Sequence, residues 1–514
     1  MTQGGGLLQL VATGKQDVFL TGNPSVSWFK FVYRRYTNFA IESQRMYFDG
    51  TPNFGQKISC LVPRNGDLLG PIFLKLTLPQ LYDQSGNRIG YVNSPGHSLI
   101  QEISVQIGEQ EIDKQTGQFM EIWSSLTVDA SQRAGFDLMT GTKPGYPFID
   151  NGNAAPDVTP QDVSGCIPRY IFSRENGNPL VDVSGVRVSG TSFADAKIRP
   201  DVTNTTPPPF ANRFPRNYDD PIMGPVTLYI PLRFWFNKNP GLYLPLLAMQ
   251  YHPVRINVTL SPLQSMFYTK QLYRQETPNT PCNAGISVQP AQLDIQLWGD
   301  YVFLDIPERR RFVSAPLEYL IEQVQYSPPL AIPANSRTAT LGLNFNHPIK
   351  ELIWTIQRNV MVSRHEYFNW SSLGFYEIEM NQVNNINVVN GVSRTPNRTD
   401  LMVNAKVQLD GQDRFDARDP VFFRLVQPYQ RHTTIPSDRY IYVYSFALRP
   451  EDLQPSGTLN ASRIDNFVLQ VGLQEQGTTY CTSAIFGDMT AYVYATNYNV
   501  LRVIDGYAGL LFSV

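Results

Sequence analysis

Two glutamates in the run Tyr376-Glu-Ile-Glu-Met380 are the nearest approach in this chain to a catalytic pair of carboxylates. Glu377 and Glu379 would share one face of a β-strand, because alternate residues of a strand point the same way. Two carboxylates held close together can carry out glycoside hydrolysis. A solvated strand face gives the same spacing far more often, since glutamate is rarely buried. We therefore interpret both residues as surface residues.

The sequence also lacks the residue spacing that metal sites and phosphate-binding loops require. A phosphate-binding loop ending at Gly14-Lys15 would need glycine in place of Gln9 and serine or threonine in place of Gln16. The chain has no GxSxG segment, and its histidines show neither HxH nor HExxH spacing. These histidines are His97, His252, His347, His365 and His432. The sequence thus predicts no catalytic residue, no metal site and no cofactor, and we expect that the protein is not an enzyme.

Two further motifs have simpler interpretations. The segment Asp410-Gly411-Gln412-Asp413 lacks the ligand alternation and the final glutamate of a calcium loop, so Asp-Gly predicts a hairpin turn. The arginines at positions 309 to 311 could contact phosphate, but three charges at a junction are more often solvated or paired.

Five acceptor sequons for N-glycosylation occur, a number that this composition produces without selection. They are Asn204, Asn257, Asn369, Asn397 and Asn460. Only Asn204 and Asn397 lie in polar segments that we expect to be exposed, so these two are the possible glycosylation sites.

A repeat shows how the elements that carry these residues are organised. Residues 227–237, 254–260 and 293–304 resemble residues 438–448, 466–473 and 491–501 in order and pattern. With Phe234 aligned on Phe446, the next strand arrives at Ile256 in one copy and at Phe467 in the other. Similar alternation can arise by chance in any two β-rich segments, but the shared order of three elements favours one β architecture used twice.

Length and composition agree with two β domains. A chain of 514 residues exceeds what one hydrophobic core usually organises. Its 36 glycines, 39 prolines, 27 tyrosines and 29 phenylalanines stand among short apolar segments typical of sandwiches and barrels. We expect strands at residues 26–33, 70–78 and 102–107, with Ile72, Leu74 and Leu76 on one face.

Boundaries follow from breaks in this pattern. Residues 1–26 are predicted to form an N-terminal arm, residues 27–313 a first domain and residues 314–514 a second, with the boundary near Ser314. Strand patterning fails at about residues 135–220 and 381–400, which we interpret as outward-facing insertions, the first with a small β element at 168–172; a flexible spacer is the alternative for the first.

Charge and cysteine usage exclude several functions. A formal charge of −2 leaves no excess positive charge to neutralise phosphates, so direct nucleic-acid packaging is not expected. The four cysteines (Cys60, Cys166, Cys282, Cys481) stand far apart and are interpreted as reduced thiols. There is no secretory signal, and no apolar run reaches membrane-spanning length, so we expect a soluble protein made in the cytosol.

Motifs along nearly the whole chain carry a family resemblance. They include GGGLLQLVATGKQD (4–17), FKFVYRRYTNF (29–39), VPRNGDLL (62–69), GDYVFLD (299–305), ERRRF (308–312), EYLIE (318–322), LDGQDRF (409–415), YSFALRPE (444–451) and QPSGT (454–458). Together they resemble the major capsid protein of nucleocytoplasmic large DNA viruses, the iridovirus, phycodnavirus and mimivirus relatives. The two insertions match no pattern of that family.

The resemblance implies an all-β fold of two consecutive eight-stranded antiparallel jelly rolls with long loop insertions and few short helices. It also implies a structural role: a homotrimer that forms a pseudo-hexagonal capsomer and tiles the icosahedral shell of a large DNA virus. The expected partners are neighbouring capsomers, minor capsid proteins and the penton protein, with an internal viral membrane nearby. The expected location is the outer capsid shell of the virion, assembled in the host cytoplasm.

Two alternatives remain open at this point. A carbohydrate-binding or glycan-cleaving jelly roll would use the aromatic content and the pair Glu377 and Glu379. A vertex or spike protein of a virus would share the fold without the abundant hexagonal role.

Overall fold

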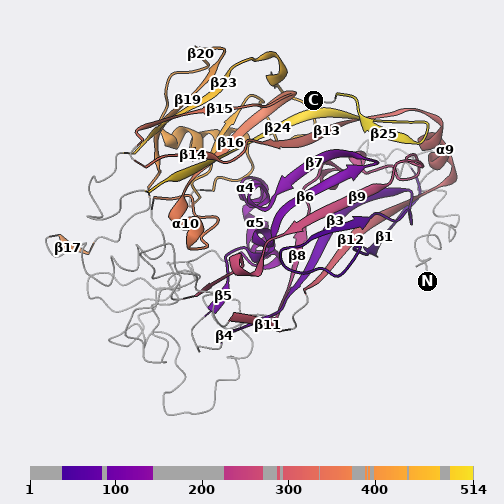
Figure 1. Ribbon diagram of the computed structural model, residues 1–514. Helices are drawn as coiled ribbons and strands as arrows, with labels where there is room; N and C mark the ends of the chain where they lie inside the picture. The colour runs from indigo at the N-terminus through magenta and orange to yellow at the C-terminus, as the bar shows by residue number, and fades with distance from the viewer. Residues whose placement is uncertain are drawn as a thin grey trace, which may run out of the picture.

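The computed structural model describes residues 37–83, 89–142, 225–269, 286–289, 293–334, 336–372, 388–389, 392–393, 399–436, 439–474 and 487–512. Two groups of antiparallel sheets follow each other along the chain. In space, helices α4 and α5 lie between the two groups (Figure 1). The predicted arm, the predicted strand at 26–33 and the small β element at 168–172 lie outside the described residues.

The first half contains two four-stranded antiparallel sheets. One has the order β1-β12-β3-β8, and the other has the order β2-β9-β6-β7. Their bounds are β1 Phe39–Met46, β12 Asp294–Leu304, β3 Leu68–Leu78, β8 Val226–Pro231, β2 Lys57–Leu61, β9 Val254–Leu260, β6 Ile100–Ile107 and β7 Gln110–Thr116. Eight antiparallel strands in two such sheets form a jelly roll. Two short pairs extend it, namely β4 (Gln80–Asp83) with β11 (Ile286–Gln289) and β5 (Ile89–Tyr91) with β10 (Phe267–Thr269).

The second half repeats this order strand for strand. Its sheets run β13-β24-β16-β21 and β15-β23-β19-β20. Their bounds are β13 Leu317–Tyr326, β24 Met489–Ile504, β16 Pro348–Arg358, β21 Tyr442–Ser445, β15 Thr338–Gly342, β23 Phe467–Leu473, β19 Met402–Leu409 and β20 Gln412–Asp413. Short strands β14 (Leu330–Ile332), β22 (Leu459–Asn460) and β25 (Tyr507–Leu510) add to the first of these sheets. The repeat read from the sequence is therefore confirmed as β8, β9 and β12 against β21, β23 and β24.

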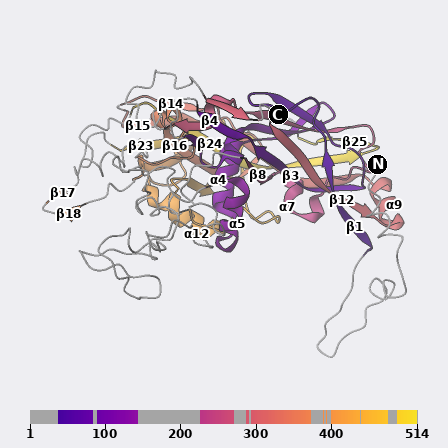
Figure 2. The same cartoon turned by 90° about the horizontal axis from the view of Figure 1, so that it is seen from below.

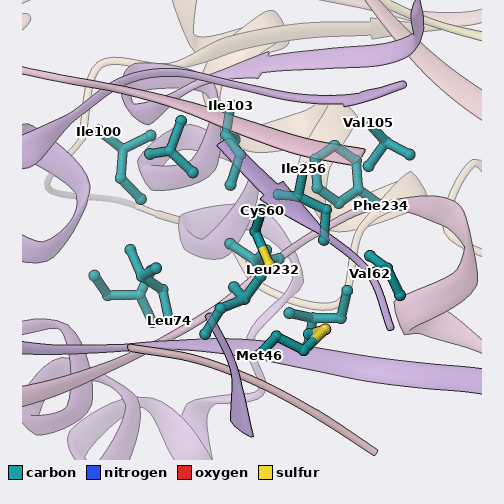
Figure 3. Close-up of a cluster of buried hydrophobic side chains, with 14 of the residues drawn as sticks. Met46, Cys60, Val62, Leu74, Ile100, Ile103, Val105, Leu232, Phe234 and Ile256 are labelled. Carbon is teal, nitrogen blue, oxygen red and sulfur yellow. The ribbon is translucent and has the colours of Figure 1, made fainter. Parts of the chain in front are cut away.

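Each half has its own apolar core between its two sheets. In β3, Ile72, Leu74 and Leu76 are buried while Phe73 and Lys75 are partly exposed, which confirms the predicted alternation. Figure 3 shows the first core, where the Cys60 thiol lies among aliphatic and aromatic side chains. Cys60 is a free thiol, and burial raises its pKa to about 12.

Short helices connect the strands. They are α3 Pro95–Leu99, α4 Gly117–Thr127, α5 Ala130–Thr140, α7 Trp235–Lys238, α9 Ile306–Ser314, α10 Asn359–Ser363, α12 Gln427–Arg431, the π-helical turn η4 Phe422–Val426, and the 3-10 turns η2 Pro240–Leu242, η3 Leu263–Ser265 and η5 Ala461–Arg463. Helix α5 continues to Thr140, past residue 135, near which the first insertion is predicted to begin. Gly141 ends α5 in the left-handed conformation, at φ 76°.

The insertions themselves are only partly described. Residues 143–224 of the first lie outside the described ranges. In the second, β17 (Val388–Val389) pairs antiparallel with β18 (Val392–Ser393).

The two halves are not separate bodies. Strands β13, β24 and β25 extend from the second half across the first (Figure 1). Ile321, Leu501, Val503 and Ala508 are buried there as members of the first core. Figure 2 shows helices α4 and α5 standing between the groups of strands.

Candidate functional site

Several residues with possible chemistry lie outside the described part of the chain. This applies to the pair Glu377 and Glu379, to the glycine-rich segment ending at Lys15, and to the sequons Asn204 and Asn397. Their predicted roles stay predictions.

The histidines do not come together. His97 contacts Glu121, His252 contacts the carbonyl oxygen of Ala508, His365 contacts that of Phe267, and His432 lies between two glutamates. Over the described ranges, no three side chains of the histidine, cysteine, aspartate or glutamate type are grouped as metal ligands would be.

The two simpler interpretations are confirmed. Asp410 and Gly411 connect β19 to β20, and both have positive φ, 49° and 81°, as a two-residue hairpin turn requires. The Nε of Arg309 lies 2.9 Å from Oδ1 of Asp67, so the first of the three arginines is paired within the protein.

A cluster of buried polar groups lies where the two halves meet. We call this contact the seam: helix α4 and β7 of the first half lie against the outer face of sheet β13-β24-β16-β21. Apolar side chains form its centre, with Phe119, Ile122 and Trp123 of α4 against Ile353 and Tyr494. The inner face of the same sheet covers the second core. Strand β16 is therefore buried on both faces, with ten of its eleven residues buried.

The position of α4 depends on local chemistry. The Thr116 hydroxyl accepts the backbone N–H of Phe119 and caps the helix. Gly117 follows, and a Cβ there would collide with the carbonyl oxygens of His97 and Ile100. Only glycine lets α4 approach helix α3 this closely.

Lysines from both halves meet one carboxylate at the seam. Glu322 of β13 pairs with Lys238 of α7 and, at 2.6 Å, with the fully buried Lys350 of β16. Burial by itself would raise the pKa of Glu322, but the two lysines lower the net pKa below its ordinary value. Burial lowers the pKa of Lys350, and Glu322 opposes that shift. The Nζ of Lys350 also donates to the carbonyl oxygen of Pro450 at 2.6 Å.

A second buried carboxylate, Glu121 of α4, joins three elements. Its Oε2 lies 2.7 Å from Nδ1 of His97 and accepts the hydroxyl of Ser94 at 2.7 Å, while its Oε1 lies 3.1 Å from Arg439 of the second half. Burial alone would raise the pKa of Glu121, but Arg439 and His97 lower it to about 2. The carboxylate is therefore charged in the folded protein.

A third set surrounds His432. Its Nε2 lies 3.1 Å from Glu351 and its Nδ1 lies 2.8 Å from Glu451. Burial would lower the pKa of His432, but the two carboxylates raise it to about 9. The ring also meets the edge of Trp123 from the first half, with centroids 6.3 Å apart.

Strand β7 makes direct contacts with β13. Asp113 Oδ1 accepts the backbone N–H of Val324 at 3.0 Å, and Gln323 donates to the carbonyl oxygen of Ile112. Burial raises the pKa of Asp113 to about 6 even though Val324 and Gln115 donate to it.

These contacts hold the two halves of the chain together. Buried groups with several satisfied partners fix one relative geometry, because displacing either partner would leave a charge buried alone. The seam thus joins the two jelly rolls through buried contacts. The sequence did not reveal it, because Glu351 and Glu121 look like ordinary surface residues until their partners, distant in sequence, are known.

Family comparisons agree with this architecture. A family described as large eukaryotic DNA virus major capsid protein matches residues 308–509, and one described as major capsid protein N-terminus matches residues 27–305. The two matches meet beside helix α9.

Individual relatives cover the whole chain. The major capsid protein of Pyramimonas orientalis virus is 34% identical, over 99% of this chain and 100% of its own length. That of Phaeocystis pouchetii virus is 33% identical, over 99% of each. A chain in the quasi-atomic structure of the PBCV-1 virus capsid has a TM-score of 0.64 and 28% identity, over 95% of this chain and 100% of that one.

Proposed function

The chain belongs to the family of large eukaryotic DNA virus major capsid proteins, and we propose that three copies of it assemble into one building block of an icosahedral shell. The protein is a structural capsid protein, and its place is the capsid shell of a virion. The observation that supports the trimer is the identical strand order of the two jelly rolls in one chain.

A ring of three copies, each with two similar jelly rolls, contains six units of similar shape. Such a ring can occupy a hexagonal lattice position although its true symmetry is threefold. The contact between copies must then be head-to-tail, with the first half of one copy against the second half of the next, and it closes after three copies. This is the pseudo-hexagonal capsomer.

Exposed apolar side chains support contacts at both ends. On the edge strand β1 of the first half, Phe39 and Ile41 are 45% and 51% exposed. In the second half, Tyr429 of helix α12 is 75% exposed. Head-to-tail closure needs two different surfaces of this kind, and apolar contact area is typical of permanent assemblies.

The remaining assignments belong to the same proposal. We assign the boundary between the rolls to the region of Ser314, the insertions to the outer surface with Asn204 and Asn397 as possible glycan sites, and residues 1–26 to an arm. Neighbouring capsomers, minor capsid proteins and the penton protein are the partners, at the outer shell over an internal membrane. Assembly takes place in the host cytoplasm, without direct contact to nucleic acid and without a catalytic role. No helix in the described ranges could span a membrane.

Light scattering on the purified protein tests the trimer. We expect a single species of about 174 kDa, three times the chain mass of 58.1 kDa. The control is the variant Phe39→Asp/Ile41→Asp, which places charge on an exposed face without touching a core, and it should lower the mass. A natural protein that stays at 58 kDa at micromolar concentration would refute the trimer and leave the family assignment intact.

A further inference from the structure

A pocket in the second half has a composition that the seam and the trimer do not explain. It is a hollow of about 240 Å³ between the segment after β20, the turn η4 with helix α12, and the residues that follow β21. Two of the family motifs line it, LDGQDRF through Arg414 and Phe415, and YSFALRPE through residues 444–448.

Three arginines line this pocket without a counter-ion. They are Arg414, Arg418 and Arg431, and no carboxylate is among the lining residues. Within the part of the chain that the structure describes, no acidic side chain is paired with any of the three, whereas Lys406, Arg424 and His432 nearby each have an acidic partner. The Nε of Arg431 is buried without an acceptor, while its Nη1 donates to the carbonyl oxygen of Leu448 at 3.1 Å.

The positions of the arginines are fixed by backbone bonds. Arg418 exchanges N–H and carbonyl bonds with Ala405 of β19 at 2.9 and 3.0 Å, and the N–H of Arg414 donates to Val407 at 2.8 Å. The guanidinium of Arg418 lies 4.4 Å from the ring centroid of Phe422. A guanidinium that lies over an aromatic ring can still present N–H donors to a carboxylate.

Aromatic rings form the rest of the wall. Phe415 and Tyr444 lie 4.6 Å apart between centroids, and Tyr444 and Phe446 lie 5.2 Å apart edge to face. Leu448 lines the rim and is exposed. The pocket therefore offers cationic donors and an apolar surface side by side, the combination found at protein contact hot spots.

We propose that this pocket binds an acidic segment of a protein partner, with an aspartate or glutamate on the arginines and an adjacent apolar side chain on the aromatic wall. A small inorganic anion would leave that wall unused. A nucleic-acid strand needs a continuous cationic surface along its backbone. Here Asp413, Asp416 and Asp419 alternate along the chain with Arg414 and Arg418, whereas a segment with one or two carboxylates needs only the arginines that line the pocket. Recognition of acidic motifs by arginine clusters is a recurring mode of peptide binding.

The test uses fluorescence polarisation on the full-length protein in its native assembly state. The probe is a labelled peptide, Ser-Phe-Asp-Glu-Phe-Ser, and the comparison peptide replaces its acids by amides, Ser-Phe-Asn-Gln-Phe-Ser. We expect the acidic peptide to bind at least tenfold more tightly than the amide peptide. Equal binding of the two peptides, or no binding, would overturn the proposal.

Variants locate the site. Arg414→Gln/Arg418→Gln should weaken binding of the acidic peptide at least tenfold, because it removes two of the three arginines that line the pocket. Both side chains are exposed and neither supports a core, so the protein should still fold. The matched control Arg463→Gln/Arg502→Gln removes the same charge from arginines that do not line the pocket, and should bind like the natural protein. Weakening by both variants alike would show unspecific attraction and sink the idea.

Two competitors separate the other ligand classes. If sodium phosphate displaces the peptide more effectively than sodium chloride of equal ionic strength, the site is one for a free oxyanion and the peptide assignment fails. An oligothymidylate that binds more tightly than the peptide would likewise reassign the pocket to nucleic acid. The inference rests on the family's structural role and not on the trimer, so native mass, measured in parallel, reports on the trimer separately.

Discussion

The charge on His432 should make a measurable part of the protein's stability depend on pH. His432 has no exposed side-chain surface and lies between Glu351 and Glu451. Its pKa of about 9 compares with 6.5 for an ordinary histidine. Because the folded pKa is raised, the stabilisation is fully present below pH 6.5 and is lost as the pH rises through 9.

The size of the effect follows from this difference. The folded pKa of about 9 and the ordinary value of 6.5 differ by roughly 2.5, which corresponds to about 3 kcal/mol. The variant His432→Gln should therefore be about 3 kcal/mol less stable than the natural protein at pH 6.5, and the difference should shrink toward zero by pH 10. Added salt should change it little, since the ions are buried.

Urea unfolding at one fixed protein concentration measures this, at pH 6.5, 8, 9 and 10. The control is His347→Gln, because burial lowers the pKa of His347, a shift in the opposite direction to that of His432. In the background of Glu451→Gln, the cost of His432→Gln should be smaller, since one of its two carboxylates is gone. If the cost of His432→Gln were the same at pH 6.5 and pH 10, His432 would not be a buried cation.

Three shorter predictions concern the seam. Gly117→Ala should prevent native folding or cost several kcal/mol in urea, because its Cβ collides with backbone, whereas Gly135→Ala, which meets open space within a helix, should stabilise by about 0.5–1 kcal/mol. Trp123→Ala should cost about 3–5 kcal/mol, measured in the same way. Glu121→Gln should lower the free energy of unfolding above pH 4.5, and the difference from the natural protein should disappear as the pH falls toward 2. A difference in unfolding free energy that stays constant over this pH range would contradict the prediction.

The sequence predicted the features that depend on residues close together in the chain or on a repeated pattern. Alternation located β3, the pair Asp410 and Gly411 has the φ values that a tight hairpin demands, and the order of three elements disclosed the duplication. Each of these signals depends on neighbours a few residues apart, or on one pattern written twice.

The seam could not be predicted because it depends on contacts between distant residues. In β16, Leu352 and Trp354 face the second core, and the alternate positions Glu351 and Thr355 look like a solvated face. Both are completely buried, because the outer face of their sheet is covered by the first half. Alternation shows that a strand has two faces, but it does not show whether the second face meets water or protein.

The strand β24 also sets the order in which the protein can be completed during synthesis. Leu501 and Val503 belong to the first core, yet they follow β12, the last strand of that roll, by about 200 residues. At roughly 5–20 residues per second, a ribosome needs on the order of 10 to 40 seconds to make that stretch. During this interval the part of the first core that β24 covers lacks its partner strand. Chains that end before β24 leave this part of the first core uncovered. The contact that joins the two rolls therefore also distinguishes complete subunits from truncated ones.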